Sequence, residues 1–262
     1  MMLENKVAVI YGAAGSIGSA MARAFAREGA RLFLTGLQLA PVEALAKEIK
    51  SAGGSAEAAA VDALDEQSID EHLQSVIDKA GRVDISFNAI GIPNSKVRAP
   101  LVELDVEQFL LPIATYTKSY FLTARLAARR MVPNKSGVIM APTAILSRTG
   151  TPLVGGAGPA MAAEEALTRN LSAELAPHGV RVVGLRPQGI PETNRIKQSY
   201  PIYAKTLGIT PEQFYELSKG KTHSKRLSTL EDLTNMAVFV ASDKASGLTG
   251  TIVNLSMGSL DD

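Results

Sequence analysis

The sequence contains no cysteine and only three histidines among its 262 residues. The absence of cysteine excludes disulfides and thiolate metal sites, and it fits a reducing compartment. His72, His178 and His223 are scattered along the chain and lack the spacing of metal ligands. We therefore expect no metal site.

An excess of either charge is also missing. Lys and Arg number 27 against 26 Asp and Glu, which gives a formal net charge of +1, and no basic block stands out. Electrostatics therefore gives no reason to expect nucleic acid or an anionic membrane as a partner. No apolar run approaches the length of a membrane span, and residues 1–6 carry no signal-peptide pattern. We expect a soluble cytoplasmic protein whose partner is a small-molecule ligand.

The chain does contain enough apolar sequence for one large core. Its hydrophobic content is 46%, and 262 residues are within reach of one α/β domain. Internal repeats and low-complexity tracts are absent. We therefore expect a single domain over residues 1–262.

A glycine-rich loop stands near the N-terminus. Residues 6–11 form a short apolar run, residues 12–18 hold the glycines, and apolar residues at helical spacing follow. Strand, loop and helix in this order are the context of a dinucleotide fingerprint, because a helix N-terminus offers amides and partial positive charge to a pyrophosphate. Gly12 permits a sharp exit from the strand, and Gly18 lets the helix lie close to the sheet. We predict that Gly12, Ser16, Ile17 and Gly18 bind a cofactor, the alternative being a tight turn and no more.

Two further stretches carry a resemblance to a known family. Leu167–Leu175 is similar to the run that follows the Tyr-x-x-x-Lys motif of short-chain dehydrogenases/reductases, and Val83–Gly91 looks like that family's fourth strand and Asn-Asn-Ala-Gly turn. The likeness extends over nearly the whole chain. It implies a Rossmann-like, doubly wound α/β sheet, with seven parallel strands, helices on both faces and a cleft at the strand C-terminal ends.

The same resemblance fixes where the family's catalytic residues would stand. Counting back from Leu167–Leu175 puts Ala157 at the tyrosine, Met161 at the lysine and Ala144 at the serine, and the helix before them puts Tyr116 at the asparagine. A shift of register does not restore the motif, because no tyrosine occurs between Tyr120 and Tyr200 and no lysine between Lys135 and Lys197. The resemblance thus implies a family member without the catalytic Ser, Tyr and Lys.

The cofactor is expected to be NAD or NADP, with the choice between them unreadable. The predicted second strand, residues 31–35, is followed by Gly36-Leu37-Gln38, which offers neither an acid for a ribose hydroxyl nor an arginine for a 2′-phosphate. Asp62 ends the predicted third strand, Glu57–Asp62, and matches the family's acid beside the adenine. The equally weighted alternative is a strand-end polar residue or a helix cap. Asn88 and Gly91 remain from the family's turn and are expected to line the cofactor, Asn88 in a structural role.

Residues 192–221 correspond to the family's variable substrate lid. Much of the aromatic content lies there, as Tyr200, Tyr203, Phe214 and Tyr215. The family forms dimers or tetramers through the helices predicted at Asp105–Arg130 and Glu164–Ala176, so we expect a homo-dimer or homo-tetramer.

Loss of the proton-transfer residues favours a protein that is not a dehydrogenase, such as a cofactor sensor, a scaffold or a partner subunit. Ala157 cannot carry a proton, and a missing positioned acid costs about 10²–10⁴ in rate. A second hypothesis is an NAD(P)-dependent oxidoreductase for a carbonyl or alcohol with a relocated acid. Tyr116 is its first candidate, ahead of Tyr200 and Tyr203, and the competing interpretation is that Tyr116 only fills the space beside Ala144 and Ala157.

A third hypothesis is chemistry without hydride transfer in the emptied pocket. Thr143, Arg148 and Arg186 would join Tyr116 in supplying polar contacts. The competing interpretation of both arginines is a solvated or paired charge.

Overall fold

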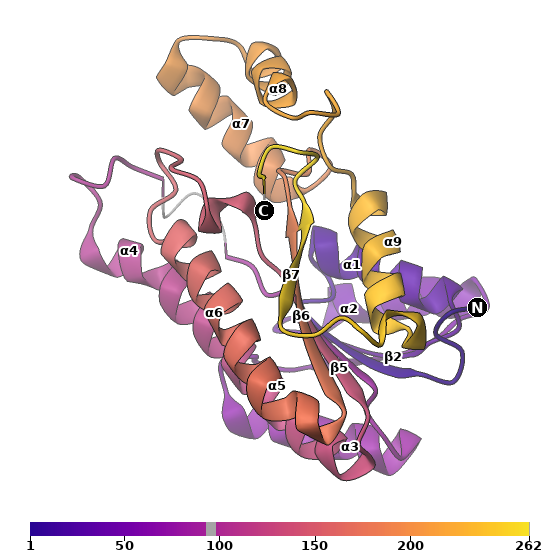
Figure 1. Ribbon diagram of the computed structural model, residues 1–262. Coiled ribbons are helices and arrows are strands. Elements are labelled where there is room, and N and C mark those ends of the chain that lie inside the picture. Colours follow the sequence, from indigo (N-terminus) through magenta and orange to yellow (C-terminus); the bar gives the residue numbers. More distant parts are fainter. Residues whose placement is uncertain (93–97, 262) are drawn as a thin grey trace.

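The computed structural model describes residues 1–92 and 98–261, and its centre is a seven-stranded parallel sheet (Figure 1). The strand order is β3-β2-β1-β4-β5-β6-β7. Strands β1 to β3 are added toward one edge of the sheet and β4 to β7 toward the other, so the order of addition reverses between β1 and β4. The predicted doubly wound α/β sheet of seven parallel strands is confirmed. The strands are β1 Val7–Tyr11, β2 Arg31–Gly36, β3 Ser55–Ala60, β4 Ile85–Asn88, β5 Gly137–Pro142, β6 Val180–Pro187 and β7 Thr251–Leu255.

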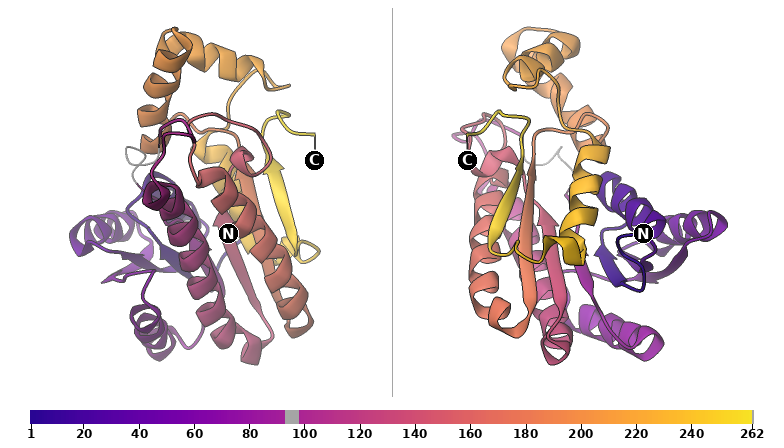
Figure 2. Two further views of the ribbon diagram at one scale, coloured as in Figure 1. Left: turned by 90° about the vertical axis from the view of Figure 1, so that its left-hand side faces the viewer. Right: turned by 45° about the vertical axis from the view of Figure 1, so that its right-hand side comes forward.

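Helices cover both faces of the sheet. Helices α1, α2 and α9 lie on one face and α3, α5 and α6 on the other, while α7 and α8 stand beyond the C-terminal ends of the strands (Figures 1 and 2). The principal helices are α1 Ser16–Arg27, α2 Leu39–Ser51, α3 Glu66–Ala80, α4 Val106–Pro112, α5 Lys118–Met131, α6 Ala157–Leu175, α7 Asn194–Leu207, α8 Pro211–Gly220 and α9 Leu230–Ala241.

Strand β1 shows why the chain folds as a sandwich of helices around a sheet. Its side chains alternate between two hydrophobic cores, Ala8 and Ile10 packing with α1 and α9, and Val9 and Tyr11 packing with α3 and α5. All five residues of the strand are buried. A strand that is apolar on both faces is the pattern of a central strand in a covered parallel sheet.

Helix ends follow local sequence signals. Asp65 caps α3 by accepting a hydrogen bond from the Gln67 amide at 3.0 Å, and Gly81 ends that helix in the left-handed region at φ 75°. The helical stretch predicted at Asp105–Arg130 contains a five-residue π-helical segment, Ile113–Thr117, which follows Pro112 and separates α4 from α5. Such wide turns within helices occur often at functional sites.

Some boundaries differ from prediction. Strand β3 begins two residues earlier than the predicted Glu57–Asp62, because its backbone pairs with β2 from Ser55 opposite Arg31. Helix α6 begins at Ala157 rather than at Glu164, so the positions aligned to the family's tyrosine and lysine lie in its first turns.

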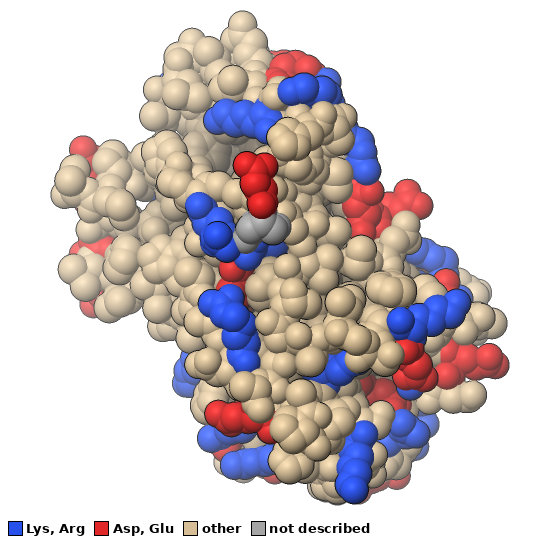
Figure 3. Space-filling view, in the orientation of Figure 1, with Lys and Arg blue, Asp and Glu red and all other residues tan. Residues whose placement is uncertain are grey.

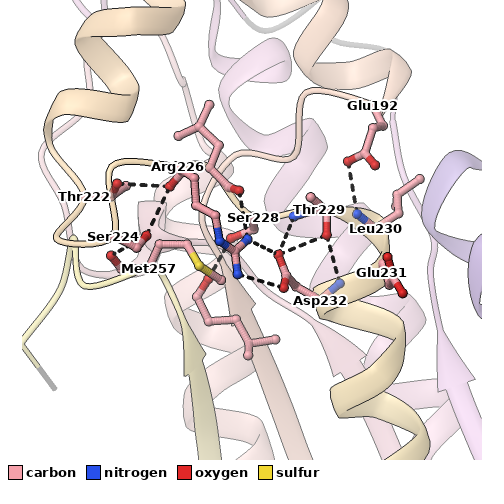
Figure 4. A network of polar contacts seen from close by, with 12 residues as sticks. Glu192, Thr222, Ser224, Arg226, Ser228, Thr229, Leu230, Glu231, Asp232 and Met257 are labelled. Atoms are coloured by element: carbon pink, nitrogen blue, oxygen red, sulfur yellow. Dashed lines mark hydrogen bonds and ion pairs between the residues drawn. The ribbon is translucent and has the colours of Figure 1, made fainter.

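The predicted lid, residues 192–221, holds α7 and α8 and joins the body at both ends. On leaving the lid, Arg226 makes two hydrogen bonds to Asp232 at the start of α9, 2.5 and 3.0 Å long (Figure 4). At the entry, Glu192 accepts a hydrogen bond from the amide of Leu230, 3.0 Å away. Both connections therefore meet at the N-terminus of α9.

On the face of the molecule drawn in Figure 3, basic and acidic side chains are interspersed, and neither charge forms a continuous patch. Within residues 1–92 and 98–261, no helix combines the length and the apolar character needed to cross a membrane.

Candidate functional site

A cavity of about 650 Å³ lies where the C-terminal ends of the central strands meet. It is lined by the loop after β1, the segments that follow β2 and β4, the end of β5, and the start of α7. Neighbouring strands β1 and β4 lead to opposite sides of the sheet at this point. A crevice at such a switch point is where open α/β sheets bind ligands.

The glycine loop packs too closely for larger residues. Gly12 has φ +70°, and a Cβ there would lie 2.7 Å from the carbonyl oxygen of Ala89. A Cβ at Gly18 would overlap the carbonyl oxygen of Gly12, so only glycine lets α1 approach the loop. The N-terminus of α1, capped by Gly15 without a side-chain hydrogen bond, presents its amides at this loop. The arrangement suits an anionic group such as a pyrophosphate.

Ser16 and Ile17, which the sequence predicts to bind a cofactor, both line the cavity. The Ser16 hydroxyl also accepts a hydrogen bond from the Asn194 amide at the start of α7, 3.1 Å away. The glycine loop and the lid are therefore in direct contact.

The wall of the cavity that follows β2 carries no charged side chain. Gly36, Leu37 and Gln38 line it after β2. Asp62 is exposed, and its carboxylate accepts a hydrogen bond from the Leu64 amide at 2.8 Å, which is a local turn. Val61, one residue earlier, is the one that lines the cavity.

Asn88 braces the floor of the cavity. Its side-chain amide donates to Thr123 of α5 at 3.0 Å, and its carbonyl oxygen accepts from the Ile90 amide at 3.0 Å. This agrees with the structural role predicted for Asn88. Gly91 lines the same wall with open space around it.

Of the four residues that the sequence predicts at the family's catalytic positions, three line the cavity. Tyr116, Ala144 and Met161 line it, and Tyr116 and Met161 pack together in a small apolar cluster that Ala144 joins. Ala157 is buried in the first turn of α6. Apart from the Tyr116 hydroxyl, these side chains offer no hydrogen-bond donor.

Tyr116 comes from the π-helical segment and keeps its hydroxyl in the cavity. That hydroxyl accepts hydrogen bonds from the Arg195 guanidinium of α7 at 2.9 Å and from the Ile92 amide at 3.3 Å. Both acceptor positions are thus used, and the O–H remains for another group. Tyr116 therefore fills space, as one interpretation predicted, and also presents a polar group, as the other did.

Sequence reasoning missed Glu164, which also lines the cavity. Its side chain is 3% exposed, and its Oε2 is buried without a hydrogen-bond partner in the described chain. Burial raises the pKa of Glu164 to about 8; the charge of Arg195 works against this rise and that of Glu165 adds to it. The signal was present, since Glu164 is three residues after Met161 and seven after Ala157 on one helix face.

A buried ion pair between Arg186 and Glu165 includes two of the four residues of the third hypothesis, Arg186 and Thr143. Arg186 makes two hydrogen bonds of 2.8 Å to Glu165, which also accepts from Thr143 at 3.1 Å and Ser147 at 2.7 Å. Burial alone would raise the pKa of Glu165, but these hydrogen bonds and the charge of Arg186 hold it below its usual range. Arg186 is thus a paired charge, as the competing interpretation predicted. Arg148 does not line the cavity.

The two lid tyrosines proposed as weaker candidates serve the packing of the lid. Tyr200 and Tyr203 lie against Phe214 of α8, with ring centroids 5.0 and 5.3 Å apart, and Arg98 stacks over Tyr203. Neither tyrosine lines the cavity.

Among residues 1–92 and 98–261, no three potential ligands gather for a metal ion. The polar side chains that line the cavity include those of Tyr116, Glu164 and Arg195.

Comparison with known proteins finds similarity along the whole chain. A family model described as enoyl-(acyl carrier protein) reductase matches residues 12–259. The uncharacterized oxidoreductase YxbG of Bacillus subtilis (strain 168) is 31% identical over 256 residues, which cover 98% of this chain and 91% of that protein.

Solved structures agree with the fold. Sorbitol-6-phosphate 2-dehydrogenase SrlD from Erwinia amylovora has a TM-score of 0.92 at 27% identity, covering 97% of this chain and 100% of that one. A 7α-hydroxysteroid dehydrogenase complexed with NADH and 7-oxo glycochenodeoxycholic acid has a TM-score of 0.87 at 28% identity, covering 99% and 96%.

Proposed function

The chain belongs to the short-chain dehydrogenase/reductase family, and we propose that it is a nicotinamide-dinucleotide-dependent oxidoreductase for a carbonyl or alcohol group of a small molecule, with a relocated acid. The observation that carries the proposal is the cavity itself. It combines a glycine loop without room for side chains with a tyrosine hydroxyl and a buried carboxyl group.

The residues present fit a dinucleotide. Gly12 and Gly18 keep the loop compact, Ser16 and the first amides of α1 would hold the pyrophosphate, and Asn88 with Gly91 would line the nicotinamide side. When bound, NAD or NADP supplies or accepts the hydride. The uncharged segment after β2 gives no preference between the two.

Proton transfer is where this chain departs from its family. Ala144, Ala157 and Met161 stand at the positions of the family's serine, tyrosine and lysine, and none of the three can donate or accept a proton. Tyr116 supplies a hydroxyl in the same cavity, supported by the Arg195 guanidinium at 2.9 Å. The guanidinium fixes the position of the Tyr116 hydroxyl and leaves its O–H directed to another group.

A second candidate is a cofactor sensor, scaffold or partner subunit without turnover. Its support is the apolar contact of Tyr116 with Met161 where the family has polar groups. The oxidoreductase names of the relatives favour catalysis instead. For either function we propose one domain over residues 1–262 with residues 192–221 as the lid, a homo-dimer or homo-tetramer, and a cytoplasmic location.

The test begins with binding. When purified protein is titrated with NADH and with NADPH, binding should increase the fluorescence of at least one of them. That dinucleotide should then be consumed in the presence of one member of a panel of ketones, aldehydes and sugars. In Tyr116→Phe the turnover should fall by about 10²–10³, the cost of one donor to a developing oxyanion. Tyr215→Phe on α8, outside the cavity, is the matched control.

Two outcomes would change the conclusion. Dinucleotide binding without turnover of any carbonyl favours the sensor or scaffold. Turnover that persists unchanged in Tyr116→Phe shows that the assignment of Tyr116 is wrong.

A further inference from the structure

We propose that Glu164 is the catalytic acid of this cleft, a neutral carboxylic acid that protonates the substrate's carbonyl oxygen during reduction. The inference rests on the proposed oxidoreductase function and names the group that delivers its proton. Glu164 lines the same cavity as Tyr116 and Met161, on the face of α6 that carries the positions of the family's tyrosine and lysine.

The first argument is the surroundings of the carboxyl group. Glu164 is 3% exposed, and Oε2 has neither water-accessible surface nor a hydrogen-bond partner in the described part of the chain. An ionised carboxylate in such a place would lack the hydrogen bonds that its charge requires, which is more unfavourable than leaving a neutral group unsatisfied. The protonated form is therefore the favoured one.

The second argument is the charges that face this group from each neighbouring element. Arg195 of α7 is the cation and Glu165 of α6 is the anion, and Tyr120 of α5 also interacts with Glu164. Tyr116, from the π-helical segment, lines the same cavity. Tyr120 stays neutral, because burial raises its pKa well above the usual range. Burial outweighs the attraction of Arg195 and raises the pKa of Glu164 to about 8.

The adjacent glutamates are thus divided by their surroundings. Glu165 is ionised and held by Arg186, 2.8 Å away, whereas Glu164 keeps its proton at neutral pH. Two neighbouring carboxyl groups whose surroundings push their pKa values apart are typical of a site in which one acts as an acid and the other stays ionised.

The chemistry balances with the reduced dinucleotide as hydride donor. The carbonyl π bond breaks as its carbon accepts the hydride and its oxygen accepts the Glu164 proton, so that C–H and O–H bonds form and Glu164 is left as a carboxylate. Arg195 offsets the new negative charge until water returns the proton. A donor whose pKa lies near the working pH serves this transfer better than a free phenol of pKa about 10. Tyr116 then has the separate task of holding the substrate oxygen through its remaining O–H.

The kinetic test compares Glu164→Gln with Glu174→Gln, an exposed position on the same helix. Glu164→Gln keeps the shape of the side chain and should lower kcat for carbonyl reduction by about 10²–10⁴, with a smaller change in KM. Reduction by the unchanged protein should decline above about pH 8, and Glu164→Gln should lose that limb. Glu164→Asp, which retains an acid, should recover part of kcat. Glu174→Gln should behave as the unchanged protein.

A second readout does not depend on turnover. In protein labelled with ¹³C at the glutamate carboxyl carbon, the resonance that disappears in Glu164→Gln should titrate near pH 8 and should move when NADH or NADPH is added. A midpoint near the ordinary value of about 4.3, or an unchanged kcat in Glu164→Gln, overturns the assignment of Glu164 alone. A midpoint near 8 in a protein that reduces no carbonyl overturns the proposed function, and the catalytic role falls with it.

Discussion

Arg195 of α7 donates a hydrogen bond to the Tyr116 hydroxyl, 2.9 Å away, and its guanidinium carbon lies 5.8 Å from the centre of the Tyr116 ring. One side chain of α7 thereby reaches the π-helical segment on the opposite wall of the cavity. The same guanidinium lowers the pKa of Glu164 against the larger effect of burial. Arg195 therefore connects the lid to both polar groups that the cavity offers.

Replacing Arg195 should change the proton affinity of Glu164. Without the cation, the ionised form of Glu164 is less favourable, so its pKa should rise in Arg195→Gln by about 1 unit. The carboxyl ¹³C titration measures this shift. Lys205→Gln, an exposed position on the same helix, should leave the midpoint in place. A midpoint that falls in Arg195→Gln contradicts the prediction.

The raised pKa of Glu164 should also appear in the stability of the fold. Because the folded form holds the proton up to about pH 8 and the unfolded chain releases it near pH 4.3, this group's contribution is full below about pH 4.3 and is lost as the pH rises to about 8. The free energy of unfolding in urea should fall over that window with a slope of at most about 1.4 kcal/mol per pH unit. Glu164→Gln should flatten the curve, whereas Glu174→Gln should not. Parallel curves for all three proteins would remove the basis for a buried acid.

Gly18 should tolerate no side chain. In Gly18→Ala the new Cβ overlaps the Gly12 carbonyl, so α1 has to move away from the loop. We expect a loss of about 1–3 kcal/mol in the free energy of unfolding, the usual cost of overpacking, together with weaker dinucleotide binding. Gly247→Ala, at an exposed position with open space around it, is the control for the substitution itself. Equal affinity of both variants for the dinucleotide would contradict a compact cradle.

Removing only one charge of the Glu165–Arg186 pair should strongly lower the free energy of unfolding. Glu165→Gln leaves a buried guanidinium without its counter-ion, and we expect about 3–5 kcal/mol of destabilisation in urea unfolding. The double variant Glu165→Gln/Arg186→Met removes both charges and should regain part of that loss. Since the pKa of Glu165 is lowered in the fold, the pair's contribution is present above the ordinary carboxyl pKa and is lost as the pH falls below it. Additive effects of the two substitutions would show that the side chains do not act as a pair.

The fold was readable from the sequence because its signals are local. An apolar strand, the Gly12–Gly18 loop and an amphipathic helix specify one βα unit, and Asp65 and Gly81 mark helix ends with side-chain and backbone chemistry that does not depend on distant contacts. The predicted start of β3 was wrong because it depends on backbone pairing with β2. The alanine-rich sequence of this strand does not indicate where that pairing begins.

The site was only partly readable, for a physical reason. Gly12, Ser16, Ile17, Asn88 and Gly91 line the cavity as the pattern predicts, since strand ends fix where they point. Glu164 was passed over because a glutamate on a helix is usually solvated, and only packing shows that this one is buried. The reach of Arg195 depends on how α7 docks, and no periodicity in residues 192–221 encodes that. Asp62, predicted evenly between a cofactor contact and a local role, makes a local turn.

The hydrogen bond between Asn194 and Ser16 couples anion binding at the glycine loop to the position of α7. A serine hydroxyl can accept from the Asn194 amide and donate its own hydrogen to a phosphate at the same time, so an arriving anion completes a chain of hydrogen bonds instead of displacing the lid. Each bond in such a chain polarises the next, and occupancy of the loop should therefore tighten the first turn of α7. Because such coupling is reciprocal, a protein that lacks the hydrogen bond between Asn194 and Ser16 should bind its dinucleotide more weakly. The factor should equal the one by which the bound dinucleotide strengthens that hydrogen bond.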